Sequence, residues 1–279
     1  MANEEKHEQE PMNEEEFLEI VLEAQKEALE KEREDRLKEE EIAKKPRRFR
    51  KMMALLMAII LAFSTFAVIF EIYSIPAIEF LKTSARLSSQ KEIQSYKKAV
   101  VQITTEDGKG TGFSISENGL IVTNEHVIDD ALTIKVSFPD DGLYKGEVVA
   151  TYPEVDLALL QVDGKDLPYL TLSEKYQYLQ QESIYIIGNP LYFTGIANEG
   201  HVLEPVLLAD WEEEVYMIDA PVYRGNSGSP VINDDGKVIG IIFATLDHEK
   251  FGQVGLFIPV AYLQERMSNS SSPHSTTGS

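Results

Sequence analysis

A serine close to two glycines is the first feature of the sequence that could do chemistry. Ser227 lies in the run Arg224–Pro230, which reads RGNSGSP, between apolar segments at Val215–Ile218 and Val231–Ile232. Glycine lacks a Cβ and permits a tight turn, so several backbone N–H groups can point at one place beside the serine hydroxyl. That arrangement would stabilise negative charge on a carbonyl oxygen during acyl transfer. The same residues are also typical of an ordinary turn between two strands.

A histidine and an aspartate upstream of this serine could take part in the same chemistry. His126 lies in the run TNEHV at residues 123–127, and Asp156 opens the run DLALL at residues 156–160. Taken alone, a histidine after a strand or an aspartate before one usually has a structural role. The order His, Asp, Ser along one chain favours a catalytic role, because three residues of the required types coincide.

Four short motifs together resemble a known enzyme family. Gly110–Phe113 reads GTGF, and TNEHV, DLALL and GNSGSP follow it in that order. These motifs are similar to the signatures of chymotrypsin-fold serine proteases, and in particular to those of the bacterial HtrA-like branch. The resemblance covers about residues 100–262. It implies an all-β fold of two six-stranded antiparallel β-barrels, with the catalytic residues in the cleft between the barrels.

The resemblance assigns a role to each polar residue. Ser227 would be the nucleophile that forms an acyl-enzyme, and His126 would be the base that activates its hydroxyl. Asp156 would fix the tautomer and orientation of His126, and the amides of Gly225 and Ser227 would form the oxyanion hole. This chemistry requires no cofactor. No cluster of His, Cys and carboxylate residues has the spacing of metal ligands, so no metal is expected either.

The sequence departs from the HtrA-like pattern in three respects. Ser229 replaces the usual glycine, as it also does in bacterial glutamyl endopeptidases, and Arg224 replaces the usual proline. The sequence ends soon after Val260, so the C-terminal PDZ domains of most HtrA-like proteins are expected to be absent. Neither peptide-triggered regulation nor trimerisation is therefore carried over from the family, and a homo-oligomer is left open.

The resemblance also indicates which residues would form the primary specificity pocket. These are Pro221, Ile242, Phe243 and Ala244, none of which offers a carboxylate to a lysine or arginine side chain. The glutamyl endopeptidases have a histidine where Ile242 lies. We therefore expect small or medium-sized apolar residues on the acyl side of the cleaved bond.

The pattern of short apolar segments agrees with a β-barrel fold. From residue 99, such segments recur every 8–12 residues with turns between them. Asp234–Gly236 predicts a hairpin, 165–175 could connect two halves, and 261–267 predicts a short helix. The expected strands are 100–104, 111–115, 120–123, 132–138, 147–151, 157–162, 183–187, 201–208, 213–218, 231–232, 238–244 and 255–259.

Composition limits the remaining possibilities. The 279 residues include no cysteine, which excludes disulfides and thiol chemistry, and the formal net charge is −21. An acidic protein repels phosphate backbones, so nucleic acid is not an expected partner. Protein or peptide substrates remain.

The N-terminal third predicts a membrane anchor. Residues 1–51 form a charged tail whose partial helical stripe could bind a partner, although a solvated helix or disordered tail is favoured. Met52–Phe70 has 19 residues and no charge, enough for a helix of about 28 Å. The basic run at 44–51 places the tail in the cytoplasm by the positive-inside rule. A cleaved signal peptide is disfavoured by the long leader.

The predicted organisation is therefore a cytoplasmic tail, one transmembrane helix, and an extracytoplasmic protease domain on the cell membrane. Residues 71–98 would be a juxtamembrane connector interrupted at Pro76, 99–267 the trypsin-like protease domain, and 268–279 a disordered tail. The expected function is a membrane-anchored serine endopeptidase of extracytoplasmic proteins. The alternative is a catalytically inactive protease-fold binding or scaffold protein of the cell envelope. A third interpretation assigns the main function to the acidic tail, as a helix that binds a cytosolic partner.

The predicted orientation can be tested in sealed right-side-out vesicles. Protease added outside should digest the C-terminal part and leave residues 1–43 intact, because the bilayer shields the tail. Immunoblotting with antibodies against each end would follow the two parts. Digestion of the tail with protection of the remainder would contradict the orientation.

Overall fold

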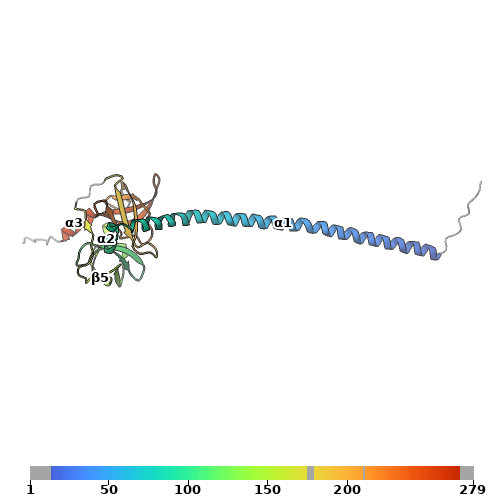
Figure 1. Ribbon diagram of the computed structural model, residues 1–279, viewed down its shortest axis with the longest axis horizontal. Coiled ribbons are helices and arrows are strands. Elements are labelled where there is room, and N and C mark those ends of the chain that lie inside the picture. The colour runs from blue at the N-terminus through green and yellow to red at the C-terminus, as the bar shows by residue number, and fades with distance from the viewer. Residues whose placement is uncertain (1–13, 175–178, 210, 271–279) are drawn as a thin grey trace, which may run out of the picture. The chain divides into compact units, whose positions relative to one another are not determined.

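The computed structural model describes residues 14–174, 179–209 and 211–270 (Figure 1). The chain divides into two compact units, Met1–Ser74 and Ile75–Ser279. The first contains most of a long helix, and the second contains the end of that helix and all the strands. The tail expected at 268–279 begins within a helix, and its residues 271–279 lie outside the described residues.

Helix α1 extends over Glu14–Leu87. Its early turns are rich in charged helix formers, and two ion pairs four residues apart, Arg36–Glu32 and Lys38–Glu34, lie on its surface. The apolar stretch Arg48–Phe66 is long and apolar enough to cross a membrane. The helix also continues through Pro76, where the sequence predicts an interruption. A proline removes one backbone donor from a helix, which need not end it.

The first barrel contains six antiparallel strands. They are β1 Val100–Thr104, β2 Lys109–Ser114, β3 Leu120–Thr123, β4 Ile134–Phe138, β5 Gly142–Tyr152 and β6 Leu157–Gln161. Their hydrogen-bonded order is β1-β2-β3-β6-β5-β4, and pairing of β1 with β4 closes the barrel. Two single 3₁₀ turns interrupt the connections, η1 at Glu125–Val127 and η2 at Pro153–Val155.

The second barrel also contains six antiparallel strands. They are β8 Ser183–Gly188, β9 Ile196–Val206, β10 Val215–Asp219, β11 Pro230–Asn233, β12 Lys237–His248 and β13 Gly252–Pro259. Their order is β11-β8-β9-β10-β13-β12, and β11 pairs with β12 to close the barrel. A two-residue strand, β7 at Thr171–Leu172, lies within the expected connector and pairs in parallel with β12. The predicted fold of two six-stranded barrels is thereby confirmed.

The strand bounds differ from expectation where polar residues continue a strand. β12 extends to His248, four residues beyond its predicted end, and β9 begins at Ile196, five residues before its predicted start. The distal part of β12 alternates exposed and half-buried residues and β13 begins with exposed ones, so this end of the hairpin lacks the apolar run that marks a core strand.

Each barrel has its own core, and a third cluster joins them. Val101, Ile121 and Leu160 lie inside the first barrel, and Val202 and Phe257 lie inside the second. The joining cluster takes fully buried side chains from both barrels and from all three helices: Leu87 of α1, Ile93 of α2, Phe113 of β2, Ile241 of β12 and Leu263 of α3. The helices therefore help to hold the barrels together.

Helix α3, at Val260–Ser270, adds a polar link between the barrels. Arg266 donates to Glu154, in η2 of the first barrel, at 2.9 Å, and to Glu213, before β10 of the second, also at 2.9 Å. Its side chain is 16% exposed. A planar guanidinium suits such a double contact, because its donors have a fixed geometry.

The segment expected to be a connector is largely a structural part of the second unit. From Ile75 onward it belongs to that unit, and α2 occupies Lys91–Ala99. Ser84 accepts a hydrogen bond at 3.1 Å from the amide of Ala197 in β9, and Arg86 forms an ion pair with Glu199 on the same strand. Because the buried residues here are few and widely spaced, the sequence alone gives little sign of this packing.

Candidate active site

His126 and Asp156 meet at the edge of the first barrel. His126 lies in η1 directly after β3, and Asp156 lies directly before β6. Strands β3 and β6 pair with Thr123 opposite Ala158, which brings the two polar residues together. His126 Nδ1 lies 2.7 Å from Asp156 Oδ2, and the amide of His126 donates to Asp156 Oδ1 at 3.0 Å. One carboxylate therefore holds both the ring and the backbone of the histidine.

The backbone of Asp156 is itself specially positioned. Its φ of 50° and ψ of 47° are left-handed, a conformation that aspartate tolerates better than most residues. Its carbonyl accepts a hydrogen bond at 2.8 Å from the Nδ2 of Asn124, which is fully buried. Asn124 belongs to the TNEHV motif, so the motif supplies both the histidine and a support for its partner.

The histidine is half exposed, whereas its partner is largely covered. The His126 side chain is 48% exposed and that of Asp156 is 15% exposed. The hydrogen bond to Asp156 raises the pKa of His126 above its ordinary value, and the charge of Glu125 adds to this effect, while burial opposes it. Burial also raises the pKa of Glu125, with a contribution from the charges of Asp129 and Asp156.

The turn that carries Ser227 depends on two glycines with positive φ. Gly225 has a φ of +97° and Gly228 a φ of +85°. A Cβ on Gly228 would lie 1.9 Å from the Thr111 carbonyl oxygen, and one on Gly225 would lie 2.7 Å from the Asn189 carbonyl oxygen. No side chain fits either position without moving the backbone.

Hydrogen bonds fix this turn against the strand behind it. Asn226 donates its amide to Tyr223 O at 3.0 Å, and Ser229 donates its amide to Asn226 O at 2.9 Å. Gly228 donates its amide to Ile242 O at 2.8 Å, which ties the turn to β12. The amides of Gly225 and Ser227 donate to no protein acceptor in the part of the chain that the structure describes. Both N–H groups are therefore free to donate to a ligand.

Thr111 of the GTGF motif connects the two barrels at this turn. Its amide donates to Ser227 O at 2.9 Å, and its hydroxyl donates to Gly225 O at 2.7 Å. The same hydroxyl accepts the amide of Asn189 at 2.9 Å. The sequence analysis did not predict this role for Thr111. The one sequence feature that could have indicated it is a polar residue between two glycines in a predicted strand.

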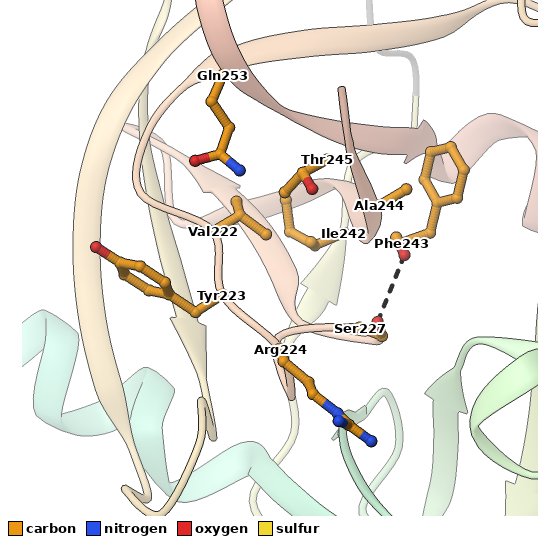
Figure 2. Close-up of a pocket in the computed structure, with 9 residues that line it drawn as sticks. All are labelled: Val222, Tyr223, Arg224, Ser227, Ile242, Phe243, Ala244, Thr245 and Gln253. Atoms are coloured by element: carbon orange, nitrogen blue, oxygen red, sulfur yellow. Dashed lines mark hydrogen bonds between the residues drawn. The ribbon is translucent and has the colours of Figure 1, made fainter. Parts of the chain in front are cut away.

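The Ser227 hydroxyl donates to the Phe243 carbonyl at 3.4 Å, as the dashed line in Figure 2 shows. Among the described residues, no hydrogen bond joins this hydroxyl to His126. In the structure, His126 is thus hydrogen-bonded to Asp156, whereas the Ser227 hydroxyl makes a long, weak contact with the Phe243 carbonyl. At 3.4 Å the contact is beyond the usual range of an O–H···O bond, so the hydroxyl can readily change partner.

A pocket of about 280 Å³ opens beside Ser227. Ile242, Phe243 and Ala244 line it, as the sequence predicts for a specificity pocket, whereas Pro221 lines a smaller neighbouring pocket of about 60 Å³. The Arg224 side chain extends away from Ile242 and Ala244 in Figure 2. The sequence did not identify the other lining residues, which come from a loop, a turn and the polar end of the β12–β13 hairpin: Val222, Tyr223, Arg224, Thr245 and Gln253.

The described residues include no group of three or more His, Cys, Asp or Glu side chains that could hold a metal ion. The pocket lining contains no carboxylate. The arrangement therefore offers a hydroxyl, an imidazole held by a carboxylate, and two available amides. These are the groups used in acyl transfer.

Comparison with known proteins agrees with this chemistry. Residues 110–241 match the family described as a trypsin-like peptidase domain. A probable periplasmic serine endoprotease DegP-like from Pseudomonas fluorescens is 40% identical over 134 residues, or 47% of this chain and 28% of that protein. One of the same name from Chlamydia pneumoniae is 34% identical over 167 residues, or 58% and 32%. The serine endoprotease from Yersinia pestis has a solved structure that aligns with a TM-score of 0.56 at 26% identity, over 64% of each chain.

The fold and the family match are those of trypsin-like serine peptidases. The named relatives are, more particularly, DegP-like endoproteases, and the chain spans about a third or less of the length of the two curated relatives. The similarity therefore concerns the two-barrel unit.

The His126–Asp156 contact predicts a shifted titration. Because the folded-state pKa of His126 is raised, the pair contributes stability that is fully present below the unfolded pKa of about 6.5 and is lost as pH rises through the folded pKa. Asp156→Asn should move the titration midpoint of His126 to lower pH, as measured by NMR of the imidazole protons. Asp129→Asn is a matched control, since Asp129 makes no hydrogen bond to His126, and it should leave the midpoint nearly unchanged. Equal midpoints in the two variants would contradict the assignment.

Proposed function

We propose that this chain is a serine endopeptidase that hydrolyses peptide bonds of extracytoplasmic proteins through His126, Asp156 and Ser227. One observation carries the proposal. His126 Nδ1 is held 2.7 Å from a largely covered carboxylate, and the amides of Gly225 and Ser227, in the turn that carries the serine hydroxyl, make no hydrogen bond to the described residues. The DegP-like relatives, which are named serine endoproteases, support the same conclusion.

Acylation would begin when the Ser227 hydroxyl leaves the Phe243 carbonyl and turns to His126. The Nε2 of the imidazole accepts the hydroxyl proton while Oγ attacks the carbonyl carbon of the substrate. The resulting imidazolium stays close to the Asp156 carboxylate, which stabilises its charge. The raised pKa of His126 has the same physical cause.

The tetrahedral oxyanion would accept hydrogen bonds from the amides of Gly225 and Ser227. Loss of one such donor in comparable enzymes lowers kcat by about 10²–10³, so correct placement of this turn has a large effect on rate. The imidazolium then gives its proton to the leaving amine. A water molecule, activated by the same imidazole, hydrolyses the acyl-enzyme.

We infer that a single span of α1 anchors the enzyme in the cell membrane, with the tail in the cytoplasm. The apolar stretch Arg48–Phe66 overlaps the predicted span Met52–Phe70, and basic residues precede both. The lipid bilayer is then a partner through this stretch. The two DegP-like relatives are described as periplasmic, which supports an extracytoplasmic position for the protease unit.

A protease-fold binding or scaffold protein is the second candidate. The contact of Ser227 with Phe243 rather than with His126 favours it, because an inactive protein has no need of an aligned hydroxyl. The two candidates differ in whether Ser227 is an activated nucleophile.

Labelling with a fluorophosphonate probe separates the two candidates. The wild-type chain should label at Ser227, and Ser227→Ala should abolish labelling and lower peptide turnover by several orders of magnitude, to about 10⁻⁴–10⁻⁶ of wild type. Ser183→Ala, at an exposed position on β8, is the matched control and should label normally. Absence of labelling in a folded wild-type chain would favour the binding protein.

The pocket beside Ser227 predicts the preferred substrates. Its lining offers no carboxylate to a basic side chain and includes Ile242, Phe243 and Ala244, so small or medium-sized apolar residues should be preferred on the acyl side of the cleaved bond. Profiling a peptide library by mass spectrometry would measure this preference, with Ser227→Ala as the blank. Dominant cleavage after Lys, Arg or Glu would contradict it.

A further inference from the structure

The wall of the pocket beside Ser227 depends on Tyr223. This residue lines both the pocket of about 280 Å³ and the smaller one of about 60 Å³. Its carbonyl accepts the Asn226 amide at 3.0 Å, which fixes the start of the turn that carries Ser227. Figure 2 shows the Tyr223 side chain extending from the loop that leads into Arg224 and Ser227. The position of Tyr223 therefore affects both the pocket and the turn.

The ring of Tyr223 is supported from outside the barrels by α1. Phe80 contacts it edge to face, with ring centroids 4.8 Å apart and an interplanar angle of 85°. Phe80 is 6% exposed, and among residues 78–83 it is the only buried side chain. Phe80 is thus a buried aromatic side chain between exposed neighbours, and its edge-to-face contact with Tyr223 adds to the energy of its burial.

Two further contacts attach this part of α1 independently of Phe80. Buried residues recur at Phe80, Ser84 and Leu87, a spacing that places them on one face of the helix. Ser84 accepts the Ala197 amide, and Leu87 is fully buried in the cluster that joins the barrels. Because these contacts remain when Phe80 is truncated, the effect of Phe80 on the pocket can be separated from attachment of the helix.

We propose that Phe80 is a positioning residue for substrate binding, supplied to the specificity pocket by the same helix that carries the apolar stretch Arg48–Phe66. Phe80 lines neither pocket and acts through Tyr223, a lining residue whose ring it contacts. The inference rests on the proposed peptidase function. It also means that residues 75–87 belong to the working enzyme, so a shortened chain that begins after them would lack part of its pocket support.

The test compares Phe80→Ala with Leu81→Ala in the full-length chain in detergent. Leu81 is the next residue of the same helix and is 39% exposed, so it controls for a general change in α1. Two peptides are used, one with a medium-sized apolar residue and one with glycine on the acyl side of the cleaved bond. Thermal unfolding of each variant gives the folded fraction.

Phe80→Ala should lower kcat/KM for the apolar peptide about threefold to tenfold, mainly through KM, and affect the glycine peptide much less. Leu81→Ala should stay within about twofold of wild type for both peptides. Phe80→Leu, which keeps apolar bulk, should restore part of the loss and remains informative if Phe80→Ala fails to fold. Equal behaviour of the Phe80 and Leu81 variants would overturn the proposal, as would a loss for both peptides that follows the folded fraction.

Binding to a chain without the nucleophile separates this proposal from the catalytic one. In a Ser227→Ala background, the affinity for the apolar peptide, measured by fluorescence anisotropy, should fall on adding Phe80→Ala and not on adding Leu81→Ala. Suppose that the wild-type chain neither labels nor cleaves, while Phe80→Ala still lowers the peptide affinity and Leu81→Ala does not. The peptidase function then fails, and the role of Phe80 in peptide binding stands. If the wild-type chain is active and the affinities do not differ, the role of Phe80 fails alone.

Discussion

The arrangement of the candidate site depends on the hydrogen bonds of Thr111. This fully buried residue belongs to the first barrel, yet its amide and hydroxyl bind the carbonyls of Ser227 and Gly225 in the second. Its own carbonyl accepts the hydroxyl of Thr123, three residues before His126. One side chain and its backbone therefore set the position of the serine turn relative to the histidine. In a buried setting such bonds are costly to leave unmade, which makes this connection rigid.

Close packing around the serine turn follows from the same connection. Gly228 lies so near the Thr111 carbonyl that a Cβ would be 1.9 Å from its oxygen, so a larger residue would push the barrels apart. On the other side of the turn, within the second barrel, Gly188 faces Ser229, whose Oγ would lie 2.3 Å from a Cβ at that position. Small residues are needed at Gly228 because the backbone of the first barrel approaches it directly, and at Gly188 because the serine turn packs against β8.

Much of this arrangement could be predicted from the sequence. The order of the four motifs predicted the two-barrel fold, and alternating apolar segments located most strands, because core strands carry a strong signal. The structure places Ile242, Phe243 and Ala244 along the pocket beside Ser227. The motifs act through backbone geometry that is fixed by residue type, above all at Gly225 and Gly228, and this is what makes them recognisable.

The remaining features depend on contacts between distant segments. Tyr223 and Gln253 reach the pocket from a loop and a hairpin end, and neither position has a local pattern. The described end of α1, residues 78–87, is buried only at Phe80, Ser84 and Leu87, so this docking segment reads in the sequence as a polar connector. The contact of the Ser227 hydroxyl with the Phe243 carbonyl depends on a side-chain rotamer, which residue types do not determine.

Arg266 gives the junction of the two barrels a further property. It contacts Glu154 from one barrel and Glu213 from the other, while Thr111 joins the barrels by separate bonds. With two such fastenings, moving the barrels apart would break both sets of contacts together. Under the proposed peptidase function, a polypeptide substrate would then have to adapt its own conformation to a fixed pair of barrels. Loosely structured or unfolded stretches would meet this requirement more easily than the surface of a compact, folded protein.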